Sequence, residues 1–254
     1  MFAHERQHQI MELLHEHRSV KVADLIKKFQ VSIETVRRDL EYLEREGMLK
    51  RVHGGAVLEE INSRELSFMD RQNKHLEAKK ELAEYAARYI IEGQSIALDV
   101  STTNTEFAKV LAKKFEKLTV LTNSLPIVQE LASKSNFTIL LAGGIVRNQE
   151  MCVVGDMAEA FISQFHIDTF FMSMSGISLT NGLTDYGIGE VQIKQRMLKS
   201  AQKAIVLADS SKFDVISLLK VCDFNQVDKI ITDSRINPKI MDKYLNQGIE
   251  VINQ

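Results

Sequence analysis

The stretch VSIETVRRDLEYLEREGMLKRVHGGA, residues 31–56, decides the fold of the first part of this chain. Ser32 is a good N-cap, and the residues that follow it predict a helix that ends at Gly47. Apolar residues recur along this helix at the spacing of one buried face, and they are Ile33, Val36, Leu40 and Leu43. After Gly47, apolar and polar residues alternate around Gly54-Gly55, which predicts a β-hairpin.

Two shorter helices are predicted before this stretch. Residues 4–17 place Ile10, Leu13 and Leu14 on one face, and residues 22–29, VADLIKKF, have the same kind of spacing. Gln30 and Val31 form a tight break before the third helix. Three short helices followed by a basic hairpin predict a winged helix-turn-helix.

The outward face of the third helix carries the candidate DNA contacts. A recognition helix brings its first residues closest to the base edges, which favours Ser32, Thr35 and Arg38 for base contacts. Arg37, Lys50 and Arg51 are better placed for phosphates, and His53 in the wing for the minor groove. The competing interpretation is a solvated helix face on which Arg37 and Arg38 pair with Glu34 and Glu41.

These motifs resemble the DeoR family signature, whose recognition helix carries TVRRDL and whose wing ends in HGGA. The resemblance covers nearly all of residues 1–58. It implies an operator-binding domain, usually one that represses sugar or nucleoside catabolic genes. It also implies that residues 32–38 are the recognition segment and residues 50–55 the wing.

Length, charge and composition limit the alternatives. The 254 residues predict two domains of unequal size. Residues 1–58 carry ten Lys and Arg against nine Asp and Glu, so net charge adds little to the DNA-binding prediction. No apolar run approaches a membrane span and no signal peptide is recognised, so we expect a cytoplasmic protein. Cys152 and Cys222 lie far apart in apolar contexts and are expected to be small buried residues rather than metal ligands.

The rest of the chain predicts a linker and an α/β domain. Residues 59–75 are polar and aperiodic and are expected to link a domain at 1–58 to one at 76–254. Residues 76–91 predict a helix. Seven β-rich runs then alternate with helical stretches, which favours a mostly parallel sheet covered by helices. The runs are SIALDV, LTVLTNS, FTILLAGG, DTFFMSMSGI, AIVLADSS, KIITDS and IEVIN.

Small polar residues end most of these predicted strands. In open α/β sheets, ligands bind outside the carboxyl ends of the strands, where such residues converge. Ser101, Thr102 and Thr103 also precede a helix whose free N–H groups suit a phosphate, and Lys212 can compensate its charge. The pattern favours a small phosphorylated, polyhydroxylated ligand. Each loop alone is equally well explained as an ordinary N-cap or turn.

The second domain resembles the DeoR-family C-terminal sensor domain, which is related in fold to ribose-5-phosphate isomerase and the CoA-transferases. The ordered motifs ALDVSTTN, VLTNS, LAGGIVR, VVGDMAE, SGIS, NGLTD and ADSSKF carry the resemblance over about residues 76–233. It implies a phosphorylated sugar or related metabolite as effector, with phosphate contacts from Ser101, Thr102, Thr103 and Lys212. The family often has Gly where Ser101 stands. Candidates for the sugar end are Asp99, Asn123, Arg147, Glu190 and Lys194.

Taken together, the sequence predicts a metabolite-controlled transcription regulator, most simply a repressor that acts as at least a dimer. It has no expected catalytic residue, metal or cofactor, and its partners are double-stranded operator DNA and the effector. Two alternatives stay open. One is an activator, and the other is a sugar-phosphate isomerase in which Asp99, Glu190 and Lys194 supply acid and base groups. A surface salt bridge between Glu190 and Lys194 would leave neither residue for a ligand.

Overall fold

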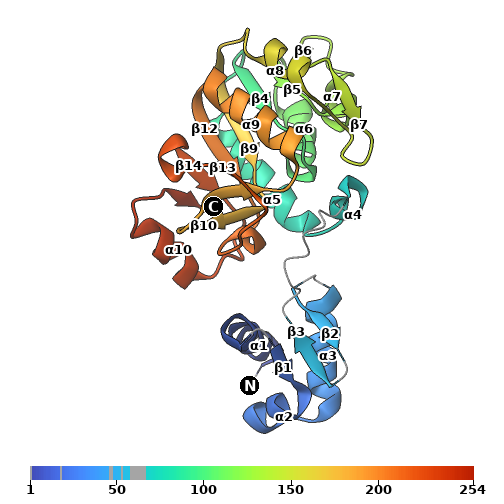
Figure 1. Ribbon diagram of the computed structural model, residues 1–254, viewed down its shortest axis with the longest axis vertical. Helices are drawn as coiled ribbons and strands as arrows, with labels where there is room; N and C mark the ends of the chain where they lie inside the picture. Colours follow the sequence, from blue (N-terminus) through green and yellow to red (C-terminus); the bar gives the residue numbers. More distant parts are fainter. Residues whose placement is uncertain (1, 18, 46–47, 53, 58–66) are drawn as a thin grey trace. The chain divides into compact units, whose positions relative to one another are not determined.

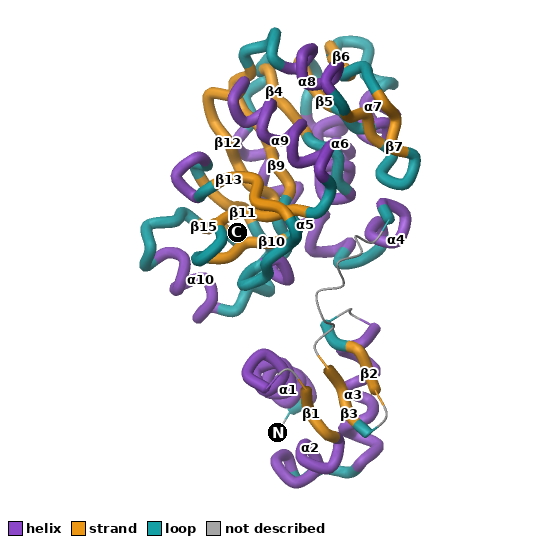
Figure 2. The backbone as a smooth tube through the Cα atoms, viewed as in Figure 1, coloured by secondary structure: helices purple, strands orange, loops and turns teal. Residues whose placement is uncertain are grey.

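The computed structural model divides into two compact units, residues 1–62 and 63–254 (Figures 1 and 2). It describes residues 2–17, 19–45, 48–52, 54–57 and 67–254. The predicted helix end at Gly47 and the candidate His53 lie outside the described residues.

The first unit is a three-helix domain with a small antiparallel sheet. Its elements are α1 (Ala3–His17), β1 (Ser19–Lys21), α2 (Val22–Phe29), α3 (Ile33–Arg45), β2 (Lys50–Val52) and β3 (Gly55–Val57). Gln30 ends α2 in the left-handed conformation at φ 53°, which confirms the predicted break. The sheet order is β1-β3-β2, so the predicted hairpin gains a third strand, β1, which is not predicted from the sequence.

The two wing glycines have separate structural roles. Gly54 has φ +82°, a conformation that side chains with a Cβ rarely adopt. Gly55 lies so close to β1 that a Cβ there would meet the carbonyl oxygen of Val20 at 2.1 Å. The pair therefore closes the hairpin and lets β3 lie against β1.

The predicted core stripe of α3 is wrong at one position. Val36, Leu40 and Leu43 are buried, but Ile33 is 38% exposed. Asp39 is buried on this side instead, at 3% exposed. The polar residue is accommodated because it forms an ion pair with Arg6 of α1.

The second unit is built around a seven-stranded parallel sheet of order β15-β14-β12-β9-β4-β5-β6. All seven predicted β-rich runs contribute a strand to it. The strands are β4 (Ser95–Leu98), β5 (Thr119–Thr122), β6 (Thr138–Leu141), β9 (Ile167–Ser173), β12 (Ala201–Leu207), β14 (Lys229–Ile231) and β15 (Val251–Ile252). The fourth run differs from prediction, because β9 ends at Ser173 and residues 176–178 form a separate strand.

Helices cover both faces of this sheet. One face is packed by α5 (Leu76–Ala86), α6 (Thr102–Lys114) and α7 (Leu125–Leu131), and the 3₁₀ turn η1 (Ala87–Tyr89) extends α5. The other face is packed by α8 (Asp156–Ile162), α9 (Ile188–Ser200) and α10 (Pro238–Leu245). Phe170 and Phe171 belong to opposite cores, as the alternation of a β-strand requires. The predicted α/β class is confirmed.

Smaller elements complete the unit. They are the hairpin β7 (Ile145–Arg147) and β8 (Cys152–Val154), the antiparallel sheet β10 (Gly176–Ser178), β11 (Gly182–Asp185) and β13 (Leu219–Cys222), and the turns η2 (Ser210–Lys212) and η3 (Phe224–Gln226). Residues 68–72 fall in the range predicted as linker, but they form helix α4 (Phe68–Gln72), and Phe68 is only 3% exposed. Burying this phenyl ring ties the start of the unit to its core.

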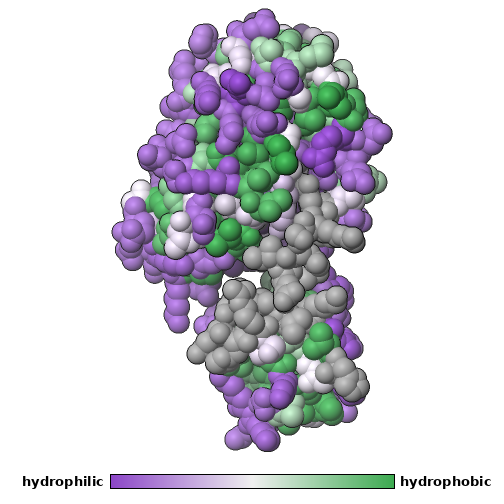
Figure 3. Space-filling view, viewed as in Figure 1, coloured by the Kyte–Doolittle hydropathy of each residue, from purple (hydrophilic) through white to green (hydrophobic). Residues whose placement is uncertain are grey.

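No helix within the described residues is long and apolar enough to cross a membrane. In the view of Figure 3 the surface of residues 67–254 is mainly hydrophilic, with scattered apolar areas. Both cysteines are free and buried, as the sequence predicts.

Candidate functional site

The start of α3 presents an exposed, positively charged face. Arg37 and Arg38 are exposed, and neither forms a hydrogen bond or ion pair with any described residue. Glu41, the predicted partner of these arginines, instead lies 2.7 Å from the guanidinium of Arg51. The geometry therefore leaves Arg37 and Arg38 available to a ligand.

Ser32 caps α3 as predicted. Its Oγ accepts a hydrogen bond from the backbone N–H of Thr35 at 3.2 Å and lies 3.0 Å from the hydroxyl of Thr35. One hydroxyl of this pair donates to the other, so the pair has a single hydroxyl hydrogen left for an outside acceptor. The two candidate base contacts are thus coupled.

The wing residue Arg51 is tied to the recognition helix. Its guanidinium pairs with Glu41 and, at 3.8 Å, with Glu44, while its backbone N–H donates to Glu44 at 2.8 Å. These contacts offset part of the charge that Arg51 can offer to a phosphate. Lys50 is in β2, but its side chain lies outside the described residues.

A buried ion pair sets the orientation of α3. The Arg6 guanidinium of α1 donates to both carboxylate oxygens of Asp39, at 2.5 and 3.1 Å, and both side chains are less than 10% exposed. Gln7 donates a further hydrogen bond to Asp39 at 3.3 Å. Arg38 directly precedes Asp39 and is exposed, so the face that this contact buries excludes Arg38.

In the second unit, the loop after β4 caps α6. Ser101 Oγ accepts a hydrogen bond from the N–H of Asn104 at 2.8 Å, so its hydroxyl serves the helix. Thr102 and Thr103 open α6 and are less than 10% exposed, yet their hydroxyls have no hydrogen-bond partner among the described residues. The first N–H groups of a helix likewise lack partners within it, so this turn can bind an anion.

Asp99, Lys194 and Asp185 form a buried triad behind this loop. Lys194 Nζ lies 2.6 Å from Asp99 and 2.8 Å from Asp185, and it also donates to the carbonyl and hydroxyl oxygens of Ser173. Asp99 accepts from Asn104 as well. Burial alone would lower the pKa of Lys194, but the two carboxylates outweigh it and raise that pKa, so the lysine is charged. The salt bridge considered between Glu190 and Lys194 does not form.

Glu190 belongs to a second cluster. Its Oε2 accepts from the Arg147 guanidinium at 2.6 Å, and Cys152 Sγ lies 3.6 Å from its Oε1. Gly187 leaves room for this pair, because a Cβ at that position would lie 2.0 Å from the Glu190 carboxylate and displace it. Asn123 is fully buried and uses its amide on backbone groups of Val100 and Val153.

A group of cations lies beside the start of α6. Lys79 projects from α5, which packs against α6, and it is only 4% exposed. Its ammonium donates to the carbonyl oxygen of Arg71 at 2.6 Å. Lys212 is half-buried in η2, and neither lysine forms an ion pair with a described carboxylate within 4 Å.

The electrostatics of this group are those of an anion site. Burial, together with the neighbouring cations Lys212 and Arg71, lowers the pKa of Lys79 to about 8 against the opposing effects of Asp209 and Glu106. Burial likewise lowers the pKa of His75, again with Lys212 and Lys79 contributing. Asp209 has its own pKa lowered, because Lys212 and His75 outweigh its burial. Two carboxylates, Asp209 and Glu106, therefore face a larger group of basic side chains.

Lys79 and His75 were not among the site residues predicted from the sequence, although one signal was present. Lys79 occupies a position of the buried stripe of α5 that continues through Leu82, Ala83 and Ala86. A lysine at such a position must be paired or serve a ligand. Asp185 and the Arg6–Asp39 pair were missed because they depend on contacts between distant segments.

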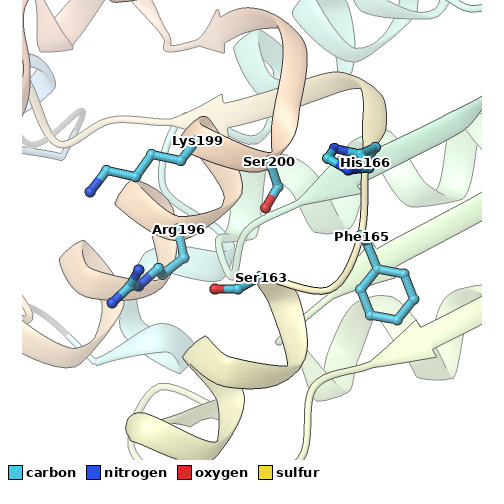
Figure 4. A pocket seen from close by; sticks show the side chains of 6 residues that line it. All are labelled: Ser163, Phe165, His166, Arg196, Lys199 and Ser200. Carbon is cyan, nitrogen blue, oxygen red and sulfur yellow. The ribbon is translucent and has the colours of Figure 1, made fainter.

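A surface hollow lies elsewhere on the second unit (Figure 4). It is lined by Ser163, Phe165, His166, Arg196, Lys199 and Ser200. His166 directly precedes β9 and Ser200 directly precedes β12, so the hollow is at the amino ends of the strands. The loop of residues 99–103 follows the carboxyl end of β4 and is thus at the opposite edge of the sheet.

Comparison with known families covers both units. Residues 6–62 match the model of the DeoR-like helix-turn-helix domain, and residues 74–234 match that of the DeoR C terminal sensor domain. The chain belongs to the DeoR family. It is a DNA-binding transcription regulator, as the sequence motifs predicted.

Characterised relatives match over the whole length. The chain is 37% identical to the HTH-type transcriptional regulator GolR of Listeria innocua over 99% of this chain and 98% of the relative. It is 29% identical to the glycerol-3-phosphate regulon repressor of Escherichia coli K12, covering 97% of each chain. Among solved structures, ribose 5-phosphate isomerase A from Neisseria gonorrhoeae is similar at 18% identity, with a TM-score of 0.40, over 56% of this chain and 54% of that one.

Proposed function

We propose that this DeoR-family regulator represses sugar catabolic genes and that a phosphorylated sugar, bound at the start of α6, controls its affinity for operator DNA. The observation that carries this proposal is the pair of lysines, Lys79 and Lys212, that lack a carboxylate partner beside the free end of a helix. A phosphate dianion supplies the negative charge that this group lacks. The glycerol-3-phosphate regulon repressor is a relative whose name links it to a phosphorylated ligand.

The candidate effector residues have different roles in this proposal. The N–H groups and hydroxyls of Thr102 and Thr103 contact the phosphate together with Lys212 and Lys79, while Ser101 holds the loop as the cap. Arg147 and Glu190, which are joined at 2.6 Å and only partly exposed on the arginine side, contact sugar hydroxyls. The polar atoms of three further candidates already form hydrogen bonds within the protein, so these residues position the loops; they are Asp99, Lys194 and Asn123.

The DNA side of the proposal rests on the first unit. Arg38, with the Ser32–Thr35 hydroxyl pair, contacts base edges, and Arg37, Lys50 and Arg51 contact phosphates. His53 keeps its proposed minor-groove contact. Helix-turn-helix domains pair on half-sites about one DNA turn apart, so the functional form is at least a dimer.

An isomerase activity is not proposed. A catalytic base must reach the proton that it removes, but Asp99 and Lys194 are in contact with each other and are at most 2% exposed. Glu190, the third candidate, is paired with Arg147 at 2.6 Å. All three groups that would do acid and base work are therefore occupied within the fold.

The test is fluorescence anisotropy with DNA selected by the protein from a random pool, titrated with a panel of sugar phosphates and the corresponding unphosphorylated sugars. At least one sugar phosphate, but not its parent sugar, should change operator affinity. Lys79→Met and Lys212→Met should weaken this response while leaving effector-free DNA binding unchanged, and the exposed Lys203→Met serves as a matched control. Equal responses to a sugar and its phosphate, or an unaltered response in both variants, would overturn the proposed site.

A further inference from the structure

Ile33 is the first residue of α3 and is exposed although the sequence pattern assigns it to the core. It does not belong to the buried cluster of the first unit or to the side chains packed against that cluster. Its neighbours on the chain, Ser32 and Glu34, are exposed too. The fold of the described residues thus does not explain why this position carries a large branched aliphatic side chain.

The surroundings of Ile33 fit nucleic acid better than a protein partner. Arg37 follows one helical turn later on the same side of α3, and it is exposed without an acidic partner among the described residues. A single isoleucine among hydroxyl and charged side chains is not the contiguous apolar patch that a protein interface uses. Side chains at the start of a helix also lean toward its N-terminus, the end that approaches base edges.

We propose that Ile33 reads thymine, by packing its side chain against the 5-methyl group of one thymine in the major groove. This inference rests on the DNA-binding function of the first unit. Thymine is the only base that carries a methyl group in the major groove, and apolar side chains recognise it there by contact. The Ser32–Thr35 pair has one hydroxyl hydrogen to offer and cannot distinguish all base pairs alone. An apolar contact beside it adds the missing discrimination.

The experiment uses the full-length protein and DNA that it selects from a random pool. Each thymine of a half-site is replaced in turn by deoxyuridine, which lacks only the 5-methyl group, and affinities are measured by anisotropy. Replacement at one of these positions should weaken DNA binding by the wild-type protein about fourfold, the change expected when one methyl-sized apolar contact is lost. Ile33→Ala should bind the thymine and deoxyuridine forms of that site equally, and Ile33→Val should retain part of the difference.

Ile188→Ala is the matched control, because Ile188 is also exposed at the start of a helix but belongs to the sensor unit. It should keep the wild-type response to deoxyuridine. The thymine contact alone is overturned if deoxyuridine changes the affinity at no position. It is also overturned if deoxyuridine weakens DNA binding by Ile33→Ala as much as binding by the wild-type protein. A protein that enriches no sequence from the pool overturns the DNA-binding assignment itself, so the two failures are distinguishable.

Discussion

The ammonium of Lys194 lies 2.6 Å from the carboxylate of Asp99, 95 residues earlier, although Glu190 stands one helical turn away from it. Asp185 completes the contact at 2.8 Å. Two buried carboxylates around one lysine are stable only while the lysine is present and charged. The arrangement ties α9 to the carboxyl ends of β4 and β11 and thereby shapes the loop at residues 99–103.

Removal of this lysine should destabilise the sensor unit strongly. Lys194→Met leaves two buried carboxylates without their cation, and we expect a loss of about 3–5 kcal/mol in the free energy of unfolding, measured by urea denaturation. Lys220→Met removes a lysine from an exposed pair with Asp223 and should change stability by less than about 1 kcal/mol. Equal stability of the two variants would show that the triad is not a structural support.

A second stability prediction concerns the Arg6–Asp39 pair. Asp39→Asn removes the carboxylate that pairs with the buried Arg6 guanidinium and should cost the first unit about 3 kcal/mol. The double variant Arg6→Met/Asp39→Leu should recover much of that loss, because no charge is then buried. Thermal unfolding of all variants gives the coupling between the two positions. A double variant as unstable as the sum of the single changes would contradict the explanation.

Sequence periodicity predicted most of the fold because the buried faces are regular. The seven strands of the sheet and helices α1, α2 and α3 follow from apolar spacing and caps. Strand β1 was missed since its three residues are too short to show a period, and it exists only by pairing with β3. Helix α4 was missed because Phe68 is its single buried residue within a polar segment.

Site residues were predictable by location but not by role. Strand-end residues do gather at one edge, yet Asn123 and Asp99 bind protein groups there, and local sequence cannot distinguish that from ligand binding. Lys194 and Glu190 stand at the spacing of a surface salt bridge, but each found a partner from a distant segment. Ile33 fits the helical stripe in sequence, while Asp39 takes the buried position through Arg6, which lies 33 residues earlier. For Lys194, Glu190 and Asp39, an ion pair with a residue from a distant segment determines which groups they contact.

Arg38 and Arg51 should contribute to DNA binding in different ways. Arg38→Ala should weaken binding to the selected site more than to random DNA, by about 1–3 kcal/mol, because it removes a base contact. Arg51→Ala should weaken both and lower the slope of log affinity against log salt by less than the roughly 0.9 expected per phosphate, since Glu41 and Glu44 already offset part of its charge. Glu41→Gln should raise affinity for random DNA at low salt. Equal losses on both DNAs for Arg38→Ala would contradict a base-reading role.

Effector affinity should depend on pH through Lys79. Its pKa in the free protein is lowered to about 8, so the unfolded chain holds this proton more tightly than the folded protein, and stability without effector should rise between about pH 8 and 10.5. A bound phosphate favours the charged lysine, so its affinity should fall as pH rises above 8. Below pH 6, protonation of the phosphate itself should weaken binding.

Calorimetric titration at pH 8 in buffers of different ionisation enthalpy measures the proton taken up when the sugar phosphate binds. Wild-type protein should take up a fraction of a proton at Lys79, whose pKa in the free protein is lowered to about 8. Lys79→Met should bind more weakly at neutral pH and lose most of the fall in affinity above pH 8. The exposed Lys203→Met should behave like wild type. Unchanged proton uptake in Lys79→Met would show that the phosphate binds away from this lysine, because a charge in contact with the dianion must hold its proton more tightly in the complex.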